Sequence, residues 1–274
     1  MGTGDSRLSE GARKRAHAAL PLTALLLGAG LFLVVGAGGK GGSLGEFAGR
    51  LPAGLLAVGA AALAGILFRA TDRAGAVVGS LLGLLIYGCM GPGGFGAAAL
   101  FVLLGSAASR LRRGRRMPRS ARHAFANLSL PAFLSLLVFA AGGPVLRAAF
   151  AASLAASLSD TVSGEVGLLS RRPPRLILGW ARVAPGTDGG VTPLGTAAGA
   201  AGSAVLSLAA AAWGVIPPDL LPVVALAGFA GTLTDSLLGA TAERAGRLGN
   251  EEVNFLAATS SALLAAAGTA LRIS

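Results

Sequence analysis

Residues 127–159 read NLSLPAFLSLLVFAAGGPVLRAAFAASLAASLS, a stretch in which Arg147 is the only charged residue. Two apolar runs, 127–142 and 144–159, flank a Gly-Gly-Pro turn at 142–144. Neither run alternates with the period of two residues that a membrane β-strand shows. A membrane-spanning helix needs roughly 20 mostly apolar residues, and each run falls somewhat short of that length. The stretch therefore predicts either two short membrane helices or one broken helix.

Similar apolar runs recur along the whole chain. We expect nine spans, near 17–37, 51–68, 75–90, 94–109, 127–142, 144–159, 194–215, 219–240 and 253–271. A Gly-Pro-Gly-Gly turn at 91–94 separates a second short pair, which again could form one broken helix. The predicted fold class is all-α, a polytopic transmembrane helical bundle of about seven to nine spans.

The composition of the 274 residues excludes several classes of protein. Hydrophobic residues make up 53% and charged residues 13%, whereas about a quarter of an average soluble domain is charged, so an ordinary cytosolic enzyme is excluded. The one cysteine, Cys89, excludes an intramolecular disulfide framework. The two histidines argue against a His-rich metal site, and 5% aromatic residues do not support base stacking.

The net charge of +11 is explained best by basic loops between membrane spans. The chain divides into a basic N-terminus at 1–16 and a single transmembrane domain at 17–274, with motif-bearing loops at 110–126, 160–193 and 241–252. Arginines concentrate in these segments, while the alternate turns are nearly uncharged. The positive-inside rule then predicts a multi-pass protein of the cell membrane with its N-terminus and motif loops in the cytoplasm.

Two basic segments allow a second interpretation. Residues 13–36 have the basic start and apolar core of a signal peptide, but the apolar run is long, so we expect a retained first span. The arginine cluster at 110–119 could attract anionic lipid or RNA. We expect it to be a loop that sets the topology, with the lipid bilayer and no nucleic acid as the partner.

Small residues recur every fourth position in two of the spans. One stripe is Gly75, Gly79 and Gly83, and the other is Gly195, Gly199, Ser203 and Ser207. Such stripes let helix backbones approach closely where lipid supplies no hydrophobic driving force. We interpret them as packing surfaces of a tight bundle.

Three of the twelve carboxylates lie in or beside predicted spans, where a charge is costly and usually marks a site. They are Asp160, Glu165 and Asp235, and we expect them to converge at the cytoplasmic ends of their spans. On a continuous helix Asp160 and Glu165 would point about 140° apart. They could serve one ion only if the helix unwinds near Gly164, and otherwise they could hold separate ions. Hydroxyl groups flank them at Thr161, Ser163, Thr234 and Ser236, and Thr161, Ser163 and Ser236 are candidate substrate- or phosphate-binding residues.

The segment 183–196 is a glycine-rich loop that leads into the span at 194–215. Its glycines could turn backbone N–H groups toward an anion, although the loop is neither a Walker loop nor a dinucleotide fingerprint. The candidate phosphate-binding residues are Gly186, Thr187, Asp188, Gly189, Gly190, Thr192 and Thr196. Arg171, Arg172 and Arg182 on the same loop could neutralise a polyphosphate. The hard oxygens of the three carboxylates suit Mg²⁺ that bridges to phosphates.

Two asparagines complete the polar set at the predicted cytoplasmic face. Asn127 begins the span at 127–142, and Asn254 begins the span at 253–271. Each could bind a ligand or could be a helix N-cap.

These motifs together resemble the integral membrane family known as domain of unknown function 92, which includes transmembrane protein 19 and plant phytyl-phosphate kinases. The family motif Asp-Thr-x-x-Ser-Glu-x-Gly is similar to residues 160–167, where Gly164 stands at the serine position. The similarity extends from about residue 60 onward, is strong in 160–256 and is vague before residue 110. It includes the segments 185–192, 195–196, 235–241, 253–255 and 119–127. In the last of these, Leu128 follows Asn127 where the family has glycine.

The resemblance implies a CTP- or ATP-dependent kinase or transferase that acts on an isoprenoid (phytyl or prenyl) phosphate. Asp160, Glu165, Asp235 and Asn254 would be the catalytic residues, and the three carboxylates would hold Mg²⁺. The loop at 185–190 would hold phosphate, and the two asparagines would orient the acceptor or the nucleotide. The alternative is a multi-pass transporter or permease that uses the carboxylates as proton or cation sites. The chain shows no internal repeat that links its halves, and its carboxylates lie at one face, which favours the enzyme.

Overall fold

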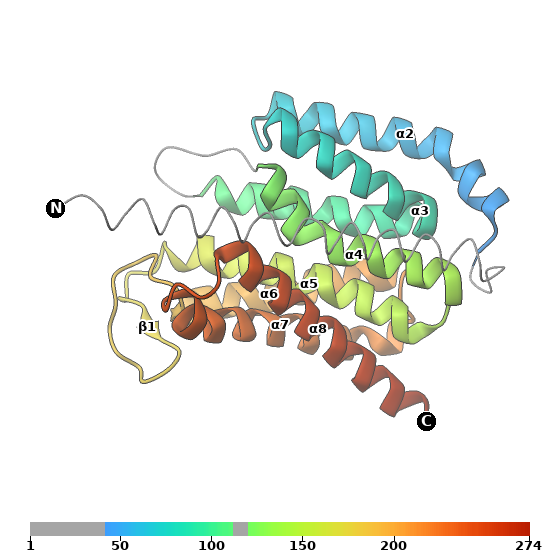
Figure 1. The fold of residues 1–274 in the computed structure, drawn as a ribbon. Coiled ribbons are helices and arrows are strands. Elements are labelled where there is room, and N and C mark those ends of the chain that lie inside the picture. The colour runs from blue at the N-terminus through green and yellow to red at the C-terminus, as the bar shows by residue number, and fades with distance from the viewer. Residues whose placement is uncertain (1–41, 112–119) are drawn as a thin grey trace.

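The computed structural model describes residues 42–111 and 120–274. The expected span at 17–37, the signal-peptide alternative at 13–36 and most of the arginine cluster at 110–119 lie outside these residues. Within them the chain forms long helices and one small hairpin (Figure 1). The described helices that are long and apolar enough to cross a membrane number seven. The chain is therefore an all-α polytopic bundle, as predicted.

The helices follow one another along the chain. They are α2 (Leu44–Leu67), α3 (Arg73–Ser109), α4 (Ala121–Ala141), α5 (Pro144–Gly167), α6 (Pro193–Ala212), α7 (Leu221–Leu238) and α8 (Asn250–Ile273). The segment between α5 and α6 is a long loop that contains the hairpin. The 3-10 helix η1 (Pro218–Leu220) precedes α7, and the π-helix η2 (Gly239–Glu243) continues it. Strands β1 (Arg175–Leu176) and β2 (Gly190–Val191) pair antiparallel between α5 and α6.

Helix α3 consists of two antiparallel limbs, because its backbone reverses at Gly91, where φ is 69° and ψ is −165°. A methyl group on Gly83 would lie 3.3 Å from the ring of Phe95, although in a straight helix residues twelve apart are about 18 Å apart. Arg110, just after α3, donates a 3.4 Å hydrogen bond to the carbonyl oxygen of Phe68, just before it. The separate spans expected at 75–90 and 94–109 are confirmed.

The Gly-Gly-Pro turn at 142–144 also separates two helices, α4 and α5. Gly142 and Gly143 have φ values of 69° and 91°, which other residues rarely adopt, and Pro144 is the first residue of α5. Asn127 of α4 and Asp160 of α5 line the same pocket, so the two helices run antiparallel. The paired-span interpretation of this stretch is therefore confirmed as well.

Several helices begin earlier than the apolar runs predict, because polar caps lie upstream of them. The Ser43 hydroxyl accepts from the Glu46 N–H at the start of α2, and the Ser120 hydroxyl accepts from the His123 N–H at the start of α4. These helices therefore begin at residues 44 and 121 rather than 51 and 127. The early start of α4 shortens the predicted loop at 110–126, and the loop predicted at 160–193 is shorter than expected because α5 continues to Gly167.

Helix α5 is the centre of the bundle and contacts α3, α4, α6, α7 and α8 (Figure 1). Its residues Phe150, Leu154 and Leu158 are fully buried. The α6 stripe of small residues packs on it as expected: a methyl group on Gly199 would lie 3.0 Å from Cβ of Ser163. By contrast, α2 lies at the periphery with Leu55, Leu56 and Leu63 exposed, as suits a lipid-facing helix.

The connections gather at two ends of the bundle. We call the end with segments 68–72, 168–192 and 239–249 the motif end, and the end with turns 91–93 and 142–143 the turn end (Figure 1). Described arginines at the motif end are Arg69, Arg73, Arg110, Arg122, Arg171, Arg172, Arg175, Arg182, Arg244 and Arg247. Those at the turn end are Arg50, Arg147 and Arg272. The basic loops thus share one side, and the cytoplasmic orientation of that side stays a prediction.

Candidate functional site

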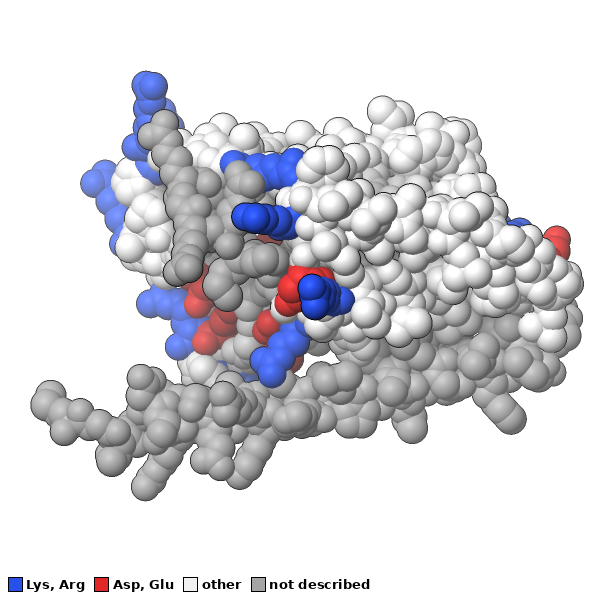
Figure 2. Space-filling model, turned by 90° about the horizontal axis from the view of Figure 1, so that it is seen from above, with Lys and Arg blue, Asp and Glu red and all other residues white. Residues whose placement is uncertain are grey.

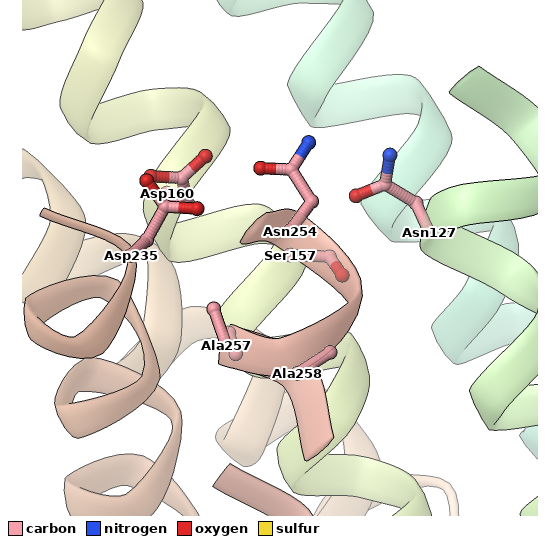
Figure 3. Close-up of a pocket in the computed structure, with 8 residues that line it drawn as sticks. Asn127, Ser157, Asp160, Asp235, Asn254, Ala257 and Ala258 are labelled. Atoms are coloured by element: carbon pink, nitrogen blue, oxygen red, sulfur yellow. The ribbon is translucent and has the colours of Figure 1, made fainter. Parts of the chain in front are cut away.

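Four helices bring polar side chains together in one small pocket at the motif end (Figure 3). Asn127 comes from α4, Asp160 from α5, Asp235 from α7 and Asn254 from α8. The remaining lining residues are Ser157, Ala156, Ala257 and Ala258. Asn127 and Asn254 are 127 positions apart in sequence, so the pocket joins the N-terminal and C-terminal halves of the described bundle.

The two aspartates are adjacent, and their side chains overlap in the close-up (Figure 3). The Oδ2 atom of Asp235 is buried and has no hydrogen-bond partner. Within the described residues neither carboxylate forms an ion pair with a lysine or arginine. Two carboxylates so close together in a bundle interior require a cation or a shared proton, because unpaired buried charge costs several kcal/mol.

The two asparagines line the same pocket from the opposite side. In Figure 3 the side-chain oxygen of Asn254 points toward the aspartates, and that of Asn127 points toward Asn254. The Asn127 amide donates a 2.9 Å hydrogen bond to the carbonyl oxygen of His123, which fixes its orientation. Neither residue is an N-cap, because α4 begins six residues before Asn127 and α8 begins four residues before Asn254. The pocket interpretation of both asparagines is the one that the geometry favours.

A hydroxyl pair holds the two aspartate-bearing helices together next to the pocket. The Thr232 hydroxyl on α7 donates a 2.6 Å hydrogen bond to the hydroxyl of Ser159 on α5, which donates a 2.8 Å bond to the carbonyl oxygen of Gly199. Ser159 directly precedes Asp160, and Thr232 precedes Asp235 by three residues. This buried connection fixes the spacing of the two carboxylates.

The pocket is small, with a volume of about 10 Å³. A cavity needs roughly 10–15 Å³ on this measure to hold one water molecule. It can therefore hold a water or a small ion between the carboxylates, and any larger ligand must lie above it at the motif end.

Glu165 does not join the aspartates, which corrects the expectation of a three-carboxylate site. Helix α5 stays helical through Gly164, whose carbonyl oxygen accepts a 3.2 Å bond from the Leu168 N–H, so Glu165 points to another side of the helix. A membrane helix resists unwinding because freed backbone groups find no water in the bilayer. No group of three His, Cys, Asp or Glu residues that could hold a metal ion occurs in the described parts of the chain.

The hydroxyls expected beside the carboxylates have other roles. Thr161 donates to the carbonyl oxygen of Ser157 at 2.8 Å within its own helix. Ser163 packs against Gly199 and Gly195 of α6, away from the pocket. Ser236 is half-buried on α7 next to Asp235 but does not line the pocket. The structure therefore brings together two of the three predicted carboxylates and both asparagines, without these hydroxyls.

The glycine-rich loop is held mainly by its own backbone. The Gly190 N–H donates to the carbonyl oxygen of Thr187 at 2.9 Å, and the Thr187 hydroxyl donates to that of Ala184 at 2.8 Å. Thr192 is the N-cap of α6, where its hydroxyl accepts from the Gly195 N–H at 3.0 Å. Gly186 and Gly189 have positive φ values of 84° and 73°. These groups thus form a tight turn, and the expected set of free phosphate donors is smaller than the sequence suggested.

The loop nevertheless lies beside the aspartate pocket. Gly189 touches the backbone of Ala240 so closely that no side chain fits between them. A methyl group on Gly239 would in turn lie 3.4 Å from the carbonyl carbon of Asp188. Both contact residues belong to η2, the π-helix that continues the helix of Asp235, and π-helical turns are frequent at functional sites.

The three arginines of this loop separate into two groups. Arg182 is exposed and lies in a β-bridge with Arg175 on the hairpin. Arg171 and Arg172 lie instead at a separate groove between the ends of α5 and α6. None of them lines the aspartate pocket.

Two residues of the site were not identified from the sequence. Ser157 lines the pocket, and its position three residues before Asp160 could have indicated the shared helix face. Glu243 lies near Asp160 and Asp188, eight residues after Asp235 and therefore about two helical turns further on. Glu251 and Glu252 also lie near Glu243, and Figure 2 shows acidic side chains gathered among arginines at this end.

The bundle and its paired aspartates define a polytopic membrane protein with an acidic site at one end. A family model described as integral membrane protein DUF92 matches residues 56–262. The chain belongs to this family of integral membrane proteins, as the sequence motifs predicted.

Similar proteins come from archaea, cyanobacteria and plants. An uncharacterized membrane protein of Methanocaldococcus jannaschii is 35% identical over 204 residues, which cover 69% of this chain and 82% of the relative. The chloroplast protein VTE6 of Arabidopsis thaliana is 30% identical over 191 residues, which cover 64% of this chain and 57% of the plant protein. An uncharacterized membrane protein of Synechocystis is 30% identical over 192 residues, with coverages of 64% and 73%. No solved structure matches the chain.

Proposed function

We propose that this protein is a membrane-embedded kinase that transfers a phosphoryl group from a nucleotide, CTP or ATP, to an isoprenoid monophosphate. The observation that carries the proposal is the pair Asp160 and Asp235, with one buried oxygen unpartnered and no described basic residue paired with either. The resemblance to plant phytyl-phosphate kinases supplies the substrate class, and a chloroplast protein shares the matched region.

The residues of the pocket fit Mg²⁺. The ion prefers hard oxygen ligands and is commonly held by one or two carboxylates together with waters and substrate phosphates. Asp160 and Asp235 supply the carboxylates, and the amide oxygens of Asn127 and Asn254 supply neutral oxygens nearby. When bound, the ion would neutralise charge on the transferring phosphoryl group.

The side chains would act mainly by positioning. An oxygen of the isoprenoid monophosphate attacks the terminal phosphorus of the nucleotide, and the bond to the leaving nucleoside diphosphate breaks. The attacking oxygen is already ionised, so no strong general base is needed, and the pocket contains no histidine or cysteine. The narrow pocket fixes the carboxylates below the reacting phosphates, while the loop at 185–190 lies beside them on η2.

The experiment is a phosphoryl-transfer assay with purified protein in detergent. Phytyl, geranylgeranyl and farnesyl monophosphates are each incubated with Mg²⁺ and radiolabelled CTP or ATP, and isoprenyl diphosphate is measured by chromatography. We expect diphosphate with at least one pair of substrates and none when EDTA is added. Absence of product from every pair would contradict the proposal.

The same preparation in proteoliposomes tests the transporter alternative. A proton or Mg²⁺ flux that consumes no nucleotide and stops in the Asp235→Asn variant would favour a transporter. We expect no such flux.

We also propose that the motif end faces the cytoplasm, which gives the site access to cytosolic nucleotide. The arginine asymmetry between the two ends supports this orientation. Single cysteines at Leu178 on the hairpin and at Ser274 are introduced into a Cys89→Ser background and treated with an impermeant maleimide in sealed vesicles. In right-side-out vesicles only the Ser274→Cys variant should react, and the reverse pattern would contradict the orientation.

A further inference from the structure

A groove lies at the motif end, outside the aspartate pocket, between the residues that follow α5 and the first residues of α6. It is open, has a volume of about 490 Å³, and is lined by Leu169, Ser170, Arg171, Arg172, Pro193 and Leu194. Asp160 lies seven residues before the end of α5, so about 10 Å of helix separates the pocket from this groove. The groove is therefore a distinct feature of the surface.

The groove combines an apolar wall with two unpaired positive charges. Leu169 is 47% exposed and Leu194 is 45% exposed, as suits side chains that contact lipid. Arg171 and Arg172 are exposed, and neither forms an ion pair with a carboxylate in the described parts of the chain. The Ser170 hydroxyl accepts from the Arg172 N–H and donates to the Arg172 carbonyl oxygen, both at 3.1 Å, which holds the arginine backbone at the rim.

The position of α6 indicates the depth of the groove in the membrane. This helix has 20 residues and is about 30 Å long, the thickness of the hydrocarbon core of a bilayer. Trp213, which is 47% exposed, ends α6 at the turn end, as expected for a tryptophan at a membrane interface. Leu194 at the opposite end of α6 then lies at the other hydrocarbon boundary, and the arginines lie at the level of lipid phosphates.

We propose that this groove binds the headgroup of an anionic phospholipid from the surrounding bilayer. Arg171 and Arg172 contact the phosphate, and Leu169, Pro193 and Leu194 contact the first methylenes of the acyl chains. Basic sites beside membrane helices are a recognised means of retaining anionic lipids. The site is separate from the proposed phosphoryl transfer, and its test does not depend on activity.

The test is native mass spectrometry of purified protein titrated with dioleoylphosphatidylglycerol or dioleoylphosphatidylcholine. We expect one tight phosphatidylglycerol per chain and weaker binding of phosphatidylcholine. With about 1 kcal/mol from each arginine, the double variant Arg171→Gln/Arg172→Gln should bind phosphatidylglycerol roughly 25-fold more weakly. The matched control Arg73→Gln/Arg122→Gln removes the same charge from exposed positions at the same end and should bind as the wild type does.

Two further measurements distinguish lipid binding in the groove from nonspecific electrostatic attraction to the basic end of the protein. Leu194→Trp fills the groove without changing charge and should also lose the tight lipid. Glycerol 3-phosphate, which has the anionic group without acyl chains, should not displace it at millimolar concentration. Any one of four results would overturn the proposal. These are equal losses of binding in both double arginine variants, wild-type binding by Leu194→Trp, displacement of the lipid by glycerol 3-phosphate, and no preference for phosphatidylglycerol.

Discussion

The two ends of the bundle use charged residues in opposite ways. At the turn end, Glu46 closes the capping box of α2, Arg50 binds the carbonyl oxygens of Gly88 and Cys89, and Asp219 pairs with Arg272. At the motif end, Asp160 and Asp235 lie against each other, and buried oxygens of Asp235 and Glu165 have no partner. These charged groups of the turn end have structural partners, whereas the paired carboxylates of the motif end have no basic partner among the described residues.

This difference supports the proposal of a functional site at the motif end more directly than the number of charges does. Adjacent carboxylates in a bundle interior lower stability, and the cation of the proposed function would offset that cost. The backbone supports the same conclusion. Both ends contain glycines with positive φ, but the turn end has tight turns, whereas the motif end carries the hairpin and the π-helix.

The sharpest test of the comparison is Asp→Asn substitution at each end. Asp160→Asn or Asp235→Asn should reduce phosphoryl transfer by about 100- to 1,000-fold, because each removes an electrostatic contact to the reacting phosphates. Thermal unfolding in detergent should show unchanged or higher stability, because either variant relieves the repulsion between the two carboxylates. Asp219→Asn is the control at the turn end and should keep full activity. Full activity in either pocket variant would contradict the assignment of Asp160 and Asp235 to the site of phosphoryl transfer.

The second test concerns the loop that lies on η2. Gly189→Ala should destabilise the protein by about 2–5 kcal/mol, because it combines a strained φ with a clash against Ala240. Gly186→Ala is the matched control, since it has the same positive φ but open space around it, and should cost only about 1–3 kcal/mol. Denaturant unfolding in mixed micelles measures both. Equal costs would show that contact with η2 does not hold the loop in place.

Much of this architecture was predictable because it follows from local composition. The lengths of the apolar runs predicted the spans that the structure describes. Gly91 and Gly142 indicated chain reversals, because glycine readily adopts the positive φ that such reversals require. The α6 stripe of Gly195, Gly199 and Ser203 correctly indicated close packing. Asp160 and Asp235 were expected to converge because both end their spans on the same side.

The remainder depends on tertiary contacts that spacing does not encode. The family motif suggests that Asp160 and Glu165 act together, but the intact α5 helix directs them apart. The glycines of 186–190 were expected to free N–H groups, yet they serve a turn that packs on η2. The sequence also allowed Asn127 and Asn254 to be helix N-caps, but the N-caps of α4 and α8 are Ser120 and Gly249.

The third test breaks a structural contact at the turn end. Arg50, half-buried, donates hydrogen bonds of 3.1 and 3.2 Å to the carbonyl oxygens of Gly88 and Cys89, which end the first limb of α3. Arg50→Gln should lower stability by about 1.5–3 kcal/mol, as is typical for losing a charged donor to buried carbonyls. Phosphoryl transfer per folded molecule should be unchanged, so the variant separates stability from function. A loss of specific activity comparable to that of Asp160→Asn would mean that the two ends are coupled.

The smallest effect is expected at the ion pair between Arg272 and Asp219. The two groups are 3.6 Å apart, with side chains 49% and 58% exposed, so solvent screens their attraction. Arg272→Gln should change stability by no more than about 0.5 kcal/mol, within the range for exposed pairs. A double-mutant cycle with Asp219→Asn, measured by denaturant unfolding at low and high salt, should give a coupling energy near zero at high salt. A large, salt-independent coupling energy would show that a charge pair at the turn end is shielded from solvent. The contrast between the two ends would then rest on the unpartnered carboxylates of the motif end alone.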